Sequence, residues 1–144
     1  MKKESFKFKS IPTLDKYLPE KSFINKCDIK NYNIKIDTRT ITEYNNTENK
    51  LPCNIPIINE SQHKFLHRHK SIAGVIVLYG LIVNASKIRK ELLKLKSYEP
   101  IIFACSKGRL RSPFMYVYAR LLNIDARIVK GGIAESNENN RITY

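Results

Sequence analysis

The chain has 144 residues, which is enough for one domain with its own core and too few for two ordinary domains. Its residues are 42% hydrophobic and 27% charged, a composition typical of a globular protein rather than a disordered chain. The 26 basic residues against 13 acidic ones give a net charge of +13, which favours polyanionic partners such as RNA. A lysine-, isoleucine- and asparagine-rich proteome would produce the same excess.

The cysteines and the apolar runs indicate the cellular compartment of the protein. Cys27, Cys53 and Cys105 form no Cys-x-x-Cys pair, so neither a disulfide framework nor a zinc site is predicted, and a reducing cytoplasm fits best. The N-terminal MKKESFKFKS has no apolar run behind its lysines and does not resemble a signal peptide. The apolar stretch 72–83 is well short of the roughly 20 residues that span a bilayer. We therefore expect a soluble, cytoplasmic protein with no membrane partner.

The chain divides into three predicted parts. Residues 1–30 are polar with scattered apolar positions and are treated as an N-terminal extension, in which residues 12–14 open a short helix that ends before Pro19. Residues 31–136 form the predicted domain. The asparagine-rich residues 137–144 are predicted to be a disordered tail.

The domain begins with a strand and a short helix. Residues 32–37 alternate between polar and apolar side chains and predict a strand with Asp37 at its carboxyl end. A turn and a short helix are predicted over 38–44. After a polar loop, the two prolines in 51–58 indicate an extended segment at the edge of a sheet rather than in its centre.

A helical zone leads to a buried strand. Residues 61–97 carry apolar side chains at helical spacing with basic residues on the other side, and Gly80 is predicted to mark a break. Pro100 stops this helix. Residues 101–104 are a continuous apolar run typical of a fully buried parallel strand, which delivers Cys105.

The end of the domain repeats the strand and helix pattern. After a loop at 106–111, Ser112 is the predicted N-cap and Pro113 the first residue of a helix that continues over 114–122. Beyond a turn at Asn123, a strand at 126–129 precedes the sharp turn Gly131-Gly132.

The alternation of strands and helices predicts an α/β fold with a parallel sheet and helices on both faces. In such sheets the reactive groups lie beyond the carboxyl ends of the strands, which is where Cys105 falls. Backbone N–H groups of a tight strand-to-helix loop stabilise an anion at its centre, so the loop favours the thiolate of Cys105. The predicted anion-binding loop consists of Ser106, Lys107, Gly108, Arg109, Leu110, Arg111 and Ser112.

The alternative for Cys105 is an ordinary buried cysteine, which is common in apolar strands. It would not explain a glycine and three cations within the six residues that follow. Neither Cys27 nor Cys53 lies at a strand-to-helix loop, and neither is assigned chemistry.

Three histidines lie in the helical zone. His63 and His67 are four residues apart, a spacing that places two imidazoles on one helix face, and His69 follows. Because no acidic or cysteine partner stands at suitable spacing, no metal site is predicted. A solvated or RNA-facing edge is the simpler interpretation.

At these residues the chain resembles the rhodanese superfamily, most closely the rhodanese-like domain of tRNA 2-selenouridine synthase, over residues 33–135. The segment Cys105 to Ser112 fits Cys-x-x-Gly-x-x-Arg-Ser, which is the active loop of selenouridine synthases and is one residue longer than in ordinary thiosulfate sulfurtransferases. The other matching segments are Ile36-Asp37-Thr38-Arg39 with the family's Asp-x-Arg element, the following Glu43-Tyr44, residues 51–57, residues 121–125 and Gly131-Gly132.

The sequence departs from the family in three ways. The histidine usually found before the second strand is absent, with Lys50 near its place, and two residues are missing between Cys53 and Asn54. The full synthase also carries a P-loop domain, whereas this sequence contains no Gly-x-x-x-x-Gly-Lys-Ser/Thr motif. The resemblance therefore implies a rhodanese half that works with a separate P-loop protein.

The resemblance implies covalent catalysis without a cofactor. Cys105 would attack an anionic sulfur or selenium donor, hold the chalcogen as a persulfide or selenide, and pass it to a thiolated wobble uridine of tRNA. The cations Lys107, Arg109 and Arg111 would orient the donor, unless Arg111 faces the backbone. Asp37 and Arg39 would brace the end of the sheet.

Two other functions remain open from the sequence. Cys-x-x-Gly-x-x-Arg is also the phosphate loop of cysteine-based phosphatases, although Ala104 replaces the histidine that usually precedes their cysteine and no acid loop is evident. The other is a non-catalytic rhodanese-like binding module whose turnover depends on a partner.

Overall fold

The computed structural model describes residues 13–134, so residue 12 and the predicted tail at 137–144 lie outside it. The strands are β1 (Phe23–Ile24), β2 (Ile34–Asp37), β3 (Cys53–Asn54), β4 (Ile101–Ala104) and β5 (Ala126–Val129). The α-helices are α1 (Ile41–Asn45), α2 (Glu60–Arg68), α3 (Ala73–Leu95) and α4 (Arg111–Leu121). Five 3₁₀ helices complete the described elements, namely η1 (Leu14–Tyr17), η2 (Glu20–Ser22), η3 (Lys26–Asn31), η4 (Lys70–Ile72) and η5 (Lys96–Tyr98).

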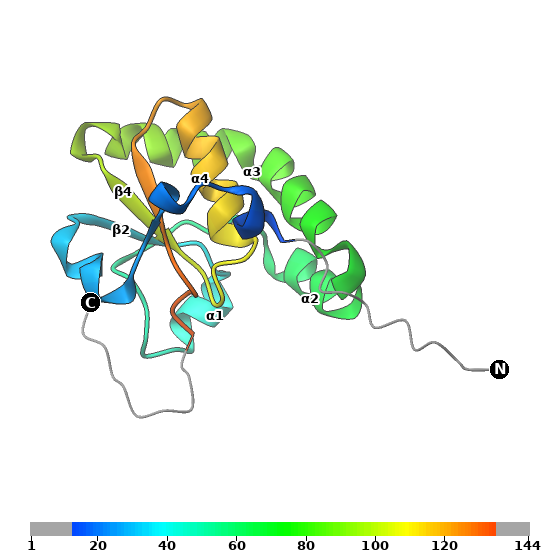
Figure 1. The fold of residues 1–144 in the computed structure, drawn as a ribbon. Helices are drawn as coiled ribbons and strands as arrows, with labels where there is room; N and C mark the ends of the chain where they lie inside the picture. The colour runs from blue at the N-terminus through cyan, green and yellow to red at the C-terminus, as the bar shows by residue number, and fades with distance from the viewer. Residues whose placement is uncertain (1–12, 135–144) are drawn as a thin grey trace.

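The five strands form one parallel sheet in the order β1-β5-β4-β2-β3 (Figure 1). This confirms the α/β fold class, and β3 lies at an edge as its prolines predict. The register places Asp37 of β2 opposite Ala104 of β4 on one side and Asn54 of β3 on the other. The carboxyl ends of these three strands therefore lie at the same level, immediately before Cys105.

The two faces of the sheet are covered differently. Ile101 and Phe103 of β4 point into a core shared with α3 and α4, which lie on one side of the sheet in Figure 1. Ile102 and Ala104 point to the opposite face. There they pack with Ile29 of η3, with Leu51 before β3 and with Ile133 after β5. All four β4 residues are fully buried, which explains the continuous apolar run.

The predicted boundary at residue 31 divides what is one structural unit. β1 pairs with β5 through the register Phe23 to Ile128 and Ile24 to Val129. Ile29 is fully buried. The described part of the predicted extension is therefore an edge strand and part of the core, a role that its polar composition does not reveal.

The predicted break at Gly80 is wrong, because the helical zone breaks at His69, between α2 and η4, where φ is −128° and ψ is 55°. Gly80 lies within the uninterrupted α3. A Cβ at this position would lie 2.4 Å from Cγ2 of Ile58 and 3.2 Å from the carbonyl oxygen of Ile57. Gly80 therefore lets the segment before α2 pack against α3.

The predicted start of α4 is also wrong. The helix begins at Arg111 with Leu110 as its N-cap residue, and no side chain caps it. Pro113 therefore occupies the third helical position, where proline is still tolerated because the first turn has no intrahelical N–H partners. Ser112 does not cap the helix because its buried hydroxyl faces the sulfur of Cys105.

Among the described residues, one helical segment, Lys70–Tyr98, is apolar and long enough to cross a membrane by length and composition alone. Its most apolar window has a mean hydropathy of 1.7, and 33% of that window is buried inside the domain. Ile76, Val77 and Leu81 pack into the core. The domain as a whole resembles a soluble α/β domain.

Candidate active site

Cys105 lies at the carboxyl end of β4 and is 3% exposed. Its Sγ accepts a hydrogen bond from the backbone N–H of Gly108 at 3.2 Å. The hydroxyl of Ser112 lies 3.3 Å from the same sulfur. A thiolate at this position would therefore receive two donors from its own loop and from the first turn of α4.

Two glycine segments pack against each other behind this loop. Gly108 has φ of +69°, and a Cβ there would lie 2.9 Å from the carbonyl oxygen of Val129. Gly132 has φ of +72°, and a Cβ there would lie 2.2 Å from the carbonyl oxygen of Ser106. The N–H groups of Ile133 and Ala134 then donate to the carbonyls of Cys105 and Ser106. The loop is thus fixed by the backbone that follows β5.

Thr38 joins β2 to the residue before the cysteine. Its N–H and its hydroxyl both donate to the carbonyl oxygen of Ala104, at 2.8 and 3.0 Å. The position of Cys105 is therefore set from the neighbouring strand as well as from its own.

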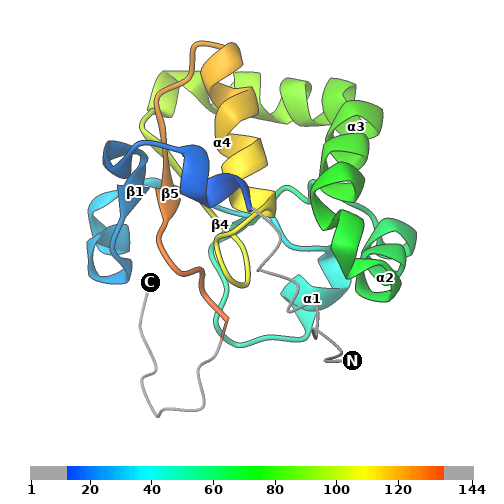
Figure 2. The ribbon, with the colours of Figure 1, turned by 45° about the vertical axis from the view of Figure 1, so that its right-hand side comes forward.

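Arg111 binds a carboxylate from a distant part of the chain. Its Nη1 lies 2.5 Å from Oε1 of Glu43 and its Nη2 lies 3.2 Å from Oε2 of Glu43 and 3.2 Å from Oγ of Ser106. The Ser106 hydroxyl also donates to Glu43. Figure 2 shows the loop after β4 lying beside α1, which carries Glu43. The guanidinium of Arg111 therefore meets the side chains of Glu43 and Ser106 and does not face the backbone, as one of its two predicted orientations required.

The pKa values of this pair follow from their contact. Burial by itself raises the pKa of Glu43, but the hydrogen bond and charge of Arg111 outweigh it and lower the pKa to about 2. For Arg111, burial lowers the pKa, whereas its hydrogen bond to Glu43 and the nearby Cys105 raise it, and the net direction is upward. Both groups are therefore charged at neutral pH.

Glu43 also connects the loop to α2. It is the third residue of α1 and forms a capping box with Thr40. Its Oε1 lies 3.4 Å from Nε2 of His63, and Nε2 of His67 lies 3.1 Å from the same nitrogen. Of the expected solvated or RNA-facing histidine edge, the solvated interpretation is wrong for His63, whose side chain is 18% exposed, whereas His67 and His69 are exposed. Burial, together with Arg111 and His67, lowers the pKa of His63 despite the opposing charge of Glu43.

Asp37 and Arg39 form a buried ion pair at the end of β2. Nη2 of Arg39 lies 2.7 Å from Oδ2 of Asp37, and the same nitrogen donates to the carbonyl of Asn49 at 2.7 Å. Asp37 is fully buried and Arg39 is 4% exposed. Both are occupied by structural partners, which is the geometry expected of a brace.

The remaining loop residues divide into exposed and anchoring side chains. Lys107 and Arg109 are exposed and can meet an incoming anion. Leu110 is partly buried and packs against the core between the sheet and α3. Within the described residues, no group of three histidine, cysteine or acidic side chains could hold a metal ion.

From the sequence, Thr38 and Glu43 belong only to matching segments and His63 only to a solvated or RNA-facing edge, so none of the three is predicted to contact the network around Cys105. The spacing Thr40-x-x-Glu43 is a capping-box signal and could have located Glu43 on the first turn of a helix. No local signal relates Glu43 to Arg111, because 68 residues separate them.

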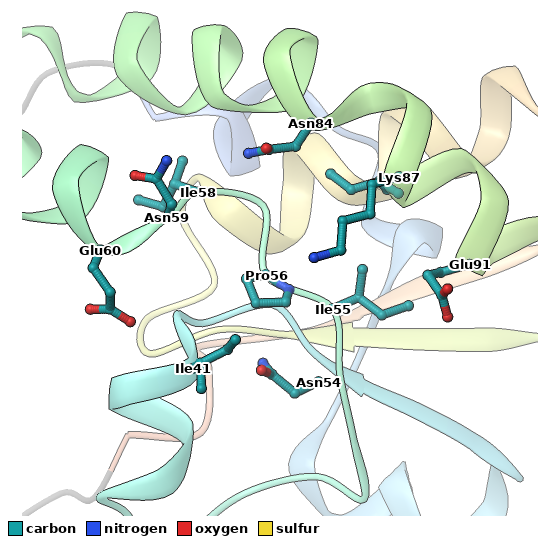
Figure 3. Close-up of a pocket in the computed structure, with 11 residues that line it drawn as sticks. Ile41, Asn54, Ile55, Pro56, Ile58, Asn59, Glu60, Asn84, Lys87 and Glu91 are labelled. Atoms are coloured by element: carbon teal, nitrogen blue, oxygen red, sulfur yellow. The ribbon is translucent and has the colours of Figure 1, made fainter.

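A cavity of about 320 Å³ lies apart from the cysteine (Figure 3). It is lined by Ile41 of α1, by residues 54–56 and 58–60, and by Asn84, Lys87, Ile88 and Glu91 of α3. The amine of Lys87 points into this space above Pro56 (Figure 3). No residue of the loop from Cys105 to Leu110 lines it, so it is not the pocket of the thiolate.

Comparisons with known proteins establish the fold alone. No protein-family model and no curated protein matches this chain. Among solved structures, the chain is similar to the N-terminal domain of a protein from Clostridium difficile 630 described as ATP/GTP binding, with a TM-score of 0.64 and 20% sequence identity. The match covers 77% of this chain and 92% of that one. The fold described above is therefore one that a solved structure also adopts.

Proposed function

We propose that the protein is a rhodanese-like sulfur- or selenium-transferase of the cytoplasm in which Cys105 is the nucleophile. The observation that carries the proposal is the placement of its Sγ at the end of a buried parallel strand, facing the N–H of Gly108 and the hydroxyl of Ser112. A thiolate held by preorganised donors is the arrangement that covalent transfer by cysteine requires.

The first step balances with thiosulfate as the sulfur donor. The Cys105 thiolate attacks the outer sulfur, a new sulfur–sulfur bond forms at the cysteine, and the bond within thiosulfate breaks to release sulfite. Selenosulfate would react in the same way and leave selenium on the cysteine. Two equivalents of a small thiol then cleave the new bond: Cys105 returns to the thiolate, the terminal atom leaves as hydrosulfide or hydroselenide for the acceptor, and the thiol is oxidised to a disulfide. Lys107 and Arg109, which are exposed beside the loop, would attract the anionic donor.

The acceptor that we propose is tRNA, and the proposed partner is a separate P-loop protein. The net charge of +13 supports contact with a polyanion. The similar structure is the N-terminal domain of a protein described as ATP/GTP binding. Under this proposal the chain would supply the rhodanese half of a split tRNA 2-selenouridine synthase, and the separate protein would supply the P-loop half.

Phosphatase chemistry fits the site less well. A cysteine phosphatase needs a protonated carboxyl near the loop to protonate the leaving group. Glu43, whose pKa is lowered to about 2, is ionised at neutral pH. It also occupies Arg111, which would otherwise bind the phosphate.

The test is intact-protein mass spectrometry of the reduced protein after exposure to thiosulfate or selenosulfate. Cys27 and Cys53 are free and exposed, whereas Cys105 is buried. We expect one added sulfur or selenium atom that persists in the Cys27→Ser and Cys53→Ser variant and disappears in Cys105→Ser.

Two results would contradict the proposal. Cysteine-dependent release of phosphate from an aryl phosphate, without any adduct, would make the protein a phosphatase. Failure of both donors to modify a folded protein would favour the non-catalytic binding module.

A further inference from the structure

An apolar surface covers one side of α3 and the adjoining end of α2. We call it the α3 stripe; it consists of Phe65, Ile72, Val75, Leu78, Tyr79, Ile82 and Val83. Their exposed fractions run from 43% for Leu78 to 66% for Ile82. Such a set exposes on the order of several hundred Å² of apolar surface, which is the size of patch that marks an interaction site on a soluble protein.

The stripe is the second apolar face of the same helix. Ile76, Val77 and Leu81 are buried against the core, while Val75 and Ile82 in the same turns are exposed. The first half of α3 is thus apolar all round, which is typical of a helix covered on every side. The second half is amphipathic, with Ile88 and Leu92 buried and Arg89 and Lys90 exposed.

The stripe is concave where α2 meets α3. Phe65 of α2 and Ile72, Val75 and Tyr79 line a groove of about 360 Å³, and Ile76, which is 6% exposed, also lines it. Side chains that project from a helix at i, i+3, i+4 and i+7 fill a groove of this kind.

The charged side chains of the segment 61–90, which carries the stripe, have one sign. No aspartate or glutamate occurs between Ser61 and Lys90. The six lysines and arginines in this segment are all exposed, namely Lys64, Arg68, Lys70, Lys87, Arg89 and Lys90. Pairing two copies of the stripe would bring these like charges together at a cost, whereas acidic groups on an occupant would be attracted.

We infer that the α3 stripe docks a partner protein through an amphipathic helix with aliphatic anchors and aspartate or glutamate on its flanks. α2 links this surface to the cysteine loop, because Gln62 lines the groove while the next residue, His63, lies against Glu43. The partner would therefore bind beside the network that holds Arg111 and Ser106. The inference rests on the surface and does not require transferase chemistry.

The experiment uses two synthetic helical peptides that share leucine anchors at i, i+3, i+4 and i+7 and carry one tryptophan. One peptide has glutamate on its flanks and the other has lysine. Because the chain contains no tryptophan, fluorescence of the peptide reports binding without background. We expect the acidic peptide to bind at least about tenfold more tightly than the basic one, and its affinity to fall as salt rises.

The matched variants are Ile82→Ser within the stripe and Leu121→Ser outside it. Both side chains are exposed, at 66% and 75%, so both variants should fold, which circular dichroism checks. Ile82→Ser should lower the affinity of the protein for the acidic peptide about tenfold, and Leu121→Ser should leave this affinity unchanged. Cys105→Ser should also bind normally, which separates this test from that of the proposed function.

Three outcomes would overturn the inference. The first is equal or absent binding of the two peptides. The second is a dimer, detected by light scattering, that Ile82→Ser dissociates. The third is sedimentation with phosphatidylglycerol vesicles that Ile82→Ser abolishes and Leu121→Ser does not.

Discussion

Glu43 is the residue on which the cysteine loop and two helices converge. Its carboxylate binds Arg111 and Ser106 of the loop, closes the capping box of α1 and lies beside His63 of α2. A single ionised side chain thus links segments that are far apart in the sequence. Its charge state should therefore influence both the stability of the domain and the shape of the loop.

The stability of the protein should depend on acid pH through Glu43. The pKa of this group is about 2 in the folded protein against a reference value of 4.5, so the unfolded chain binds more protons between these limits. The stabilisation is present above about pH 4.5 and is lost as the pH falls toward 2. Urea unfolding should show Glu43→Gln to be less stable by about 2 kcal/mol at pH 6, with the difference shrinking toward pH 2.

The matched control for this experiment is Glu91→Gln, on an exposed turn of α3 where the carboxylate meets Lys94. Its unfolding free energy should follow that of the unchanged protein at every pH to within about 0.5 kcal/mol. If the free energies of unfolding of the unchanged protein and of Glu43→Gln differ by the same amount at every pH between 2 and 6, the ion pair of Glu43 does not stabilise the fold.

At the scale of elements, the turn after β5 acts as the support of the loop after β4. β4 and β5 are neighbours in the sheet, so the segments that follow them meet at its carboxyl edge. Gly132 has no room for a side chain because the backbone of Ser106 fills that space. Gly131, with φ of +77°, has no atom within 4 Å of where its Cβ would be.

Alanine substitutions at these two glycines should therefore have different effects. Gly131→Ala introduces only the strain of a positive φ, about 1 kcal/mol of unfolding free energy. Gly132→Ala adds a clash with backbone atoms and should cost about 3 kcal/mol or displace the loop. The rate of Cys105 alkylation by iodoacetamide, measured on the Cys27→Ser and Cys53→Ser background, should change several-fold for Gly132→Ala and little for Gly131→Ala. Equal effects of the two substitutions would contradict the support that we describe.

At the scale of the whole molecule, 26 basic residues stand against 13 acidic ones, and exposed apolar side chains gather in the α3 stripe. Lys107 and Arg109 are exposed in the loop that follows Cys105, whereas the exposed cations around the α3 stripe lie on α2, η4 and α3. If the proposed acceptor is tRNA, its phosphates should reach the first of these two groups. The stripe would remain available to a protein.

Binding of tRNA should weaken steeply as salt is raised. Filter binding should give a linear fall of log K with log salt concentration, because each neutralised phosphate releases counterions. The double variant Lys107→Gln and Arg109→Gln should reduce the slope by about 2. Lys94→Gln, at an exposed position of α3 away from the loop, should leave it unchanged. If the double variant and the unchanged protein show the same slope of log K against log salt concentration, tRNA does not contact Lys107 and Arg109.

The sequence by itself determined the elements whose signals are local. The apolar run at 101–104, the alternation before Asp37 and the glycines at 131 and 132 predict the strands and the turn that the structure contains. The order of strands and helices predicts a parallel sheet, and the position of Cys105 after a buried strand places it at the carboxyl edge. These features depend on residues that are close in the chain.

Only the tertiary structure decided what surrounds the cysteine. Glu43 meets Arg111 because β2 and β4 are adjacent in the sheet, although 68 residues separate the two side chains. Ser112 is not the predicted N-cap of α4, because its hydroxyl lies 3.3 Å from Sγ of Cys105. Gly80 packs against Ile58 instead of breaking α3. Each of these outcomes depends on a contact between distant segments, which hydrophobic period, capping and turn signals do not encode.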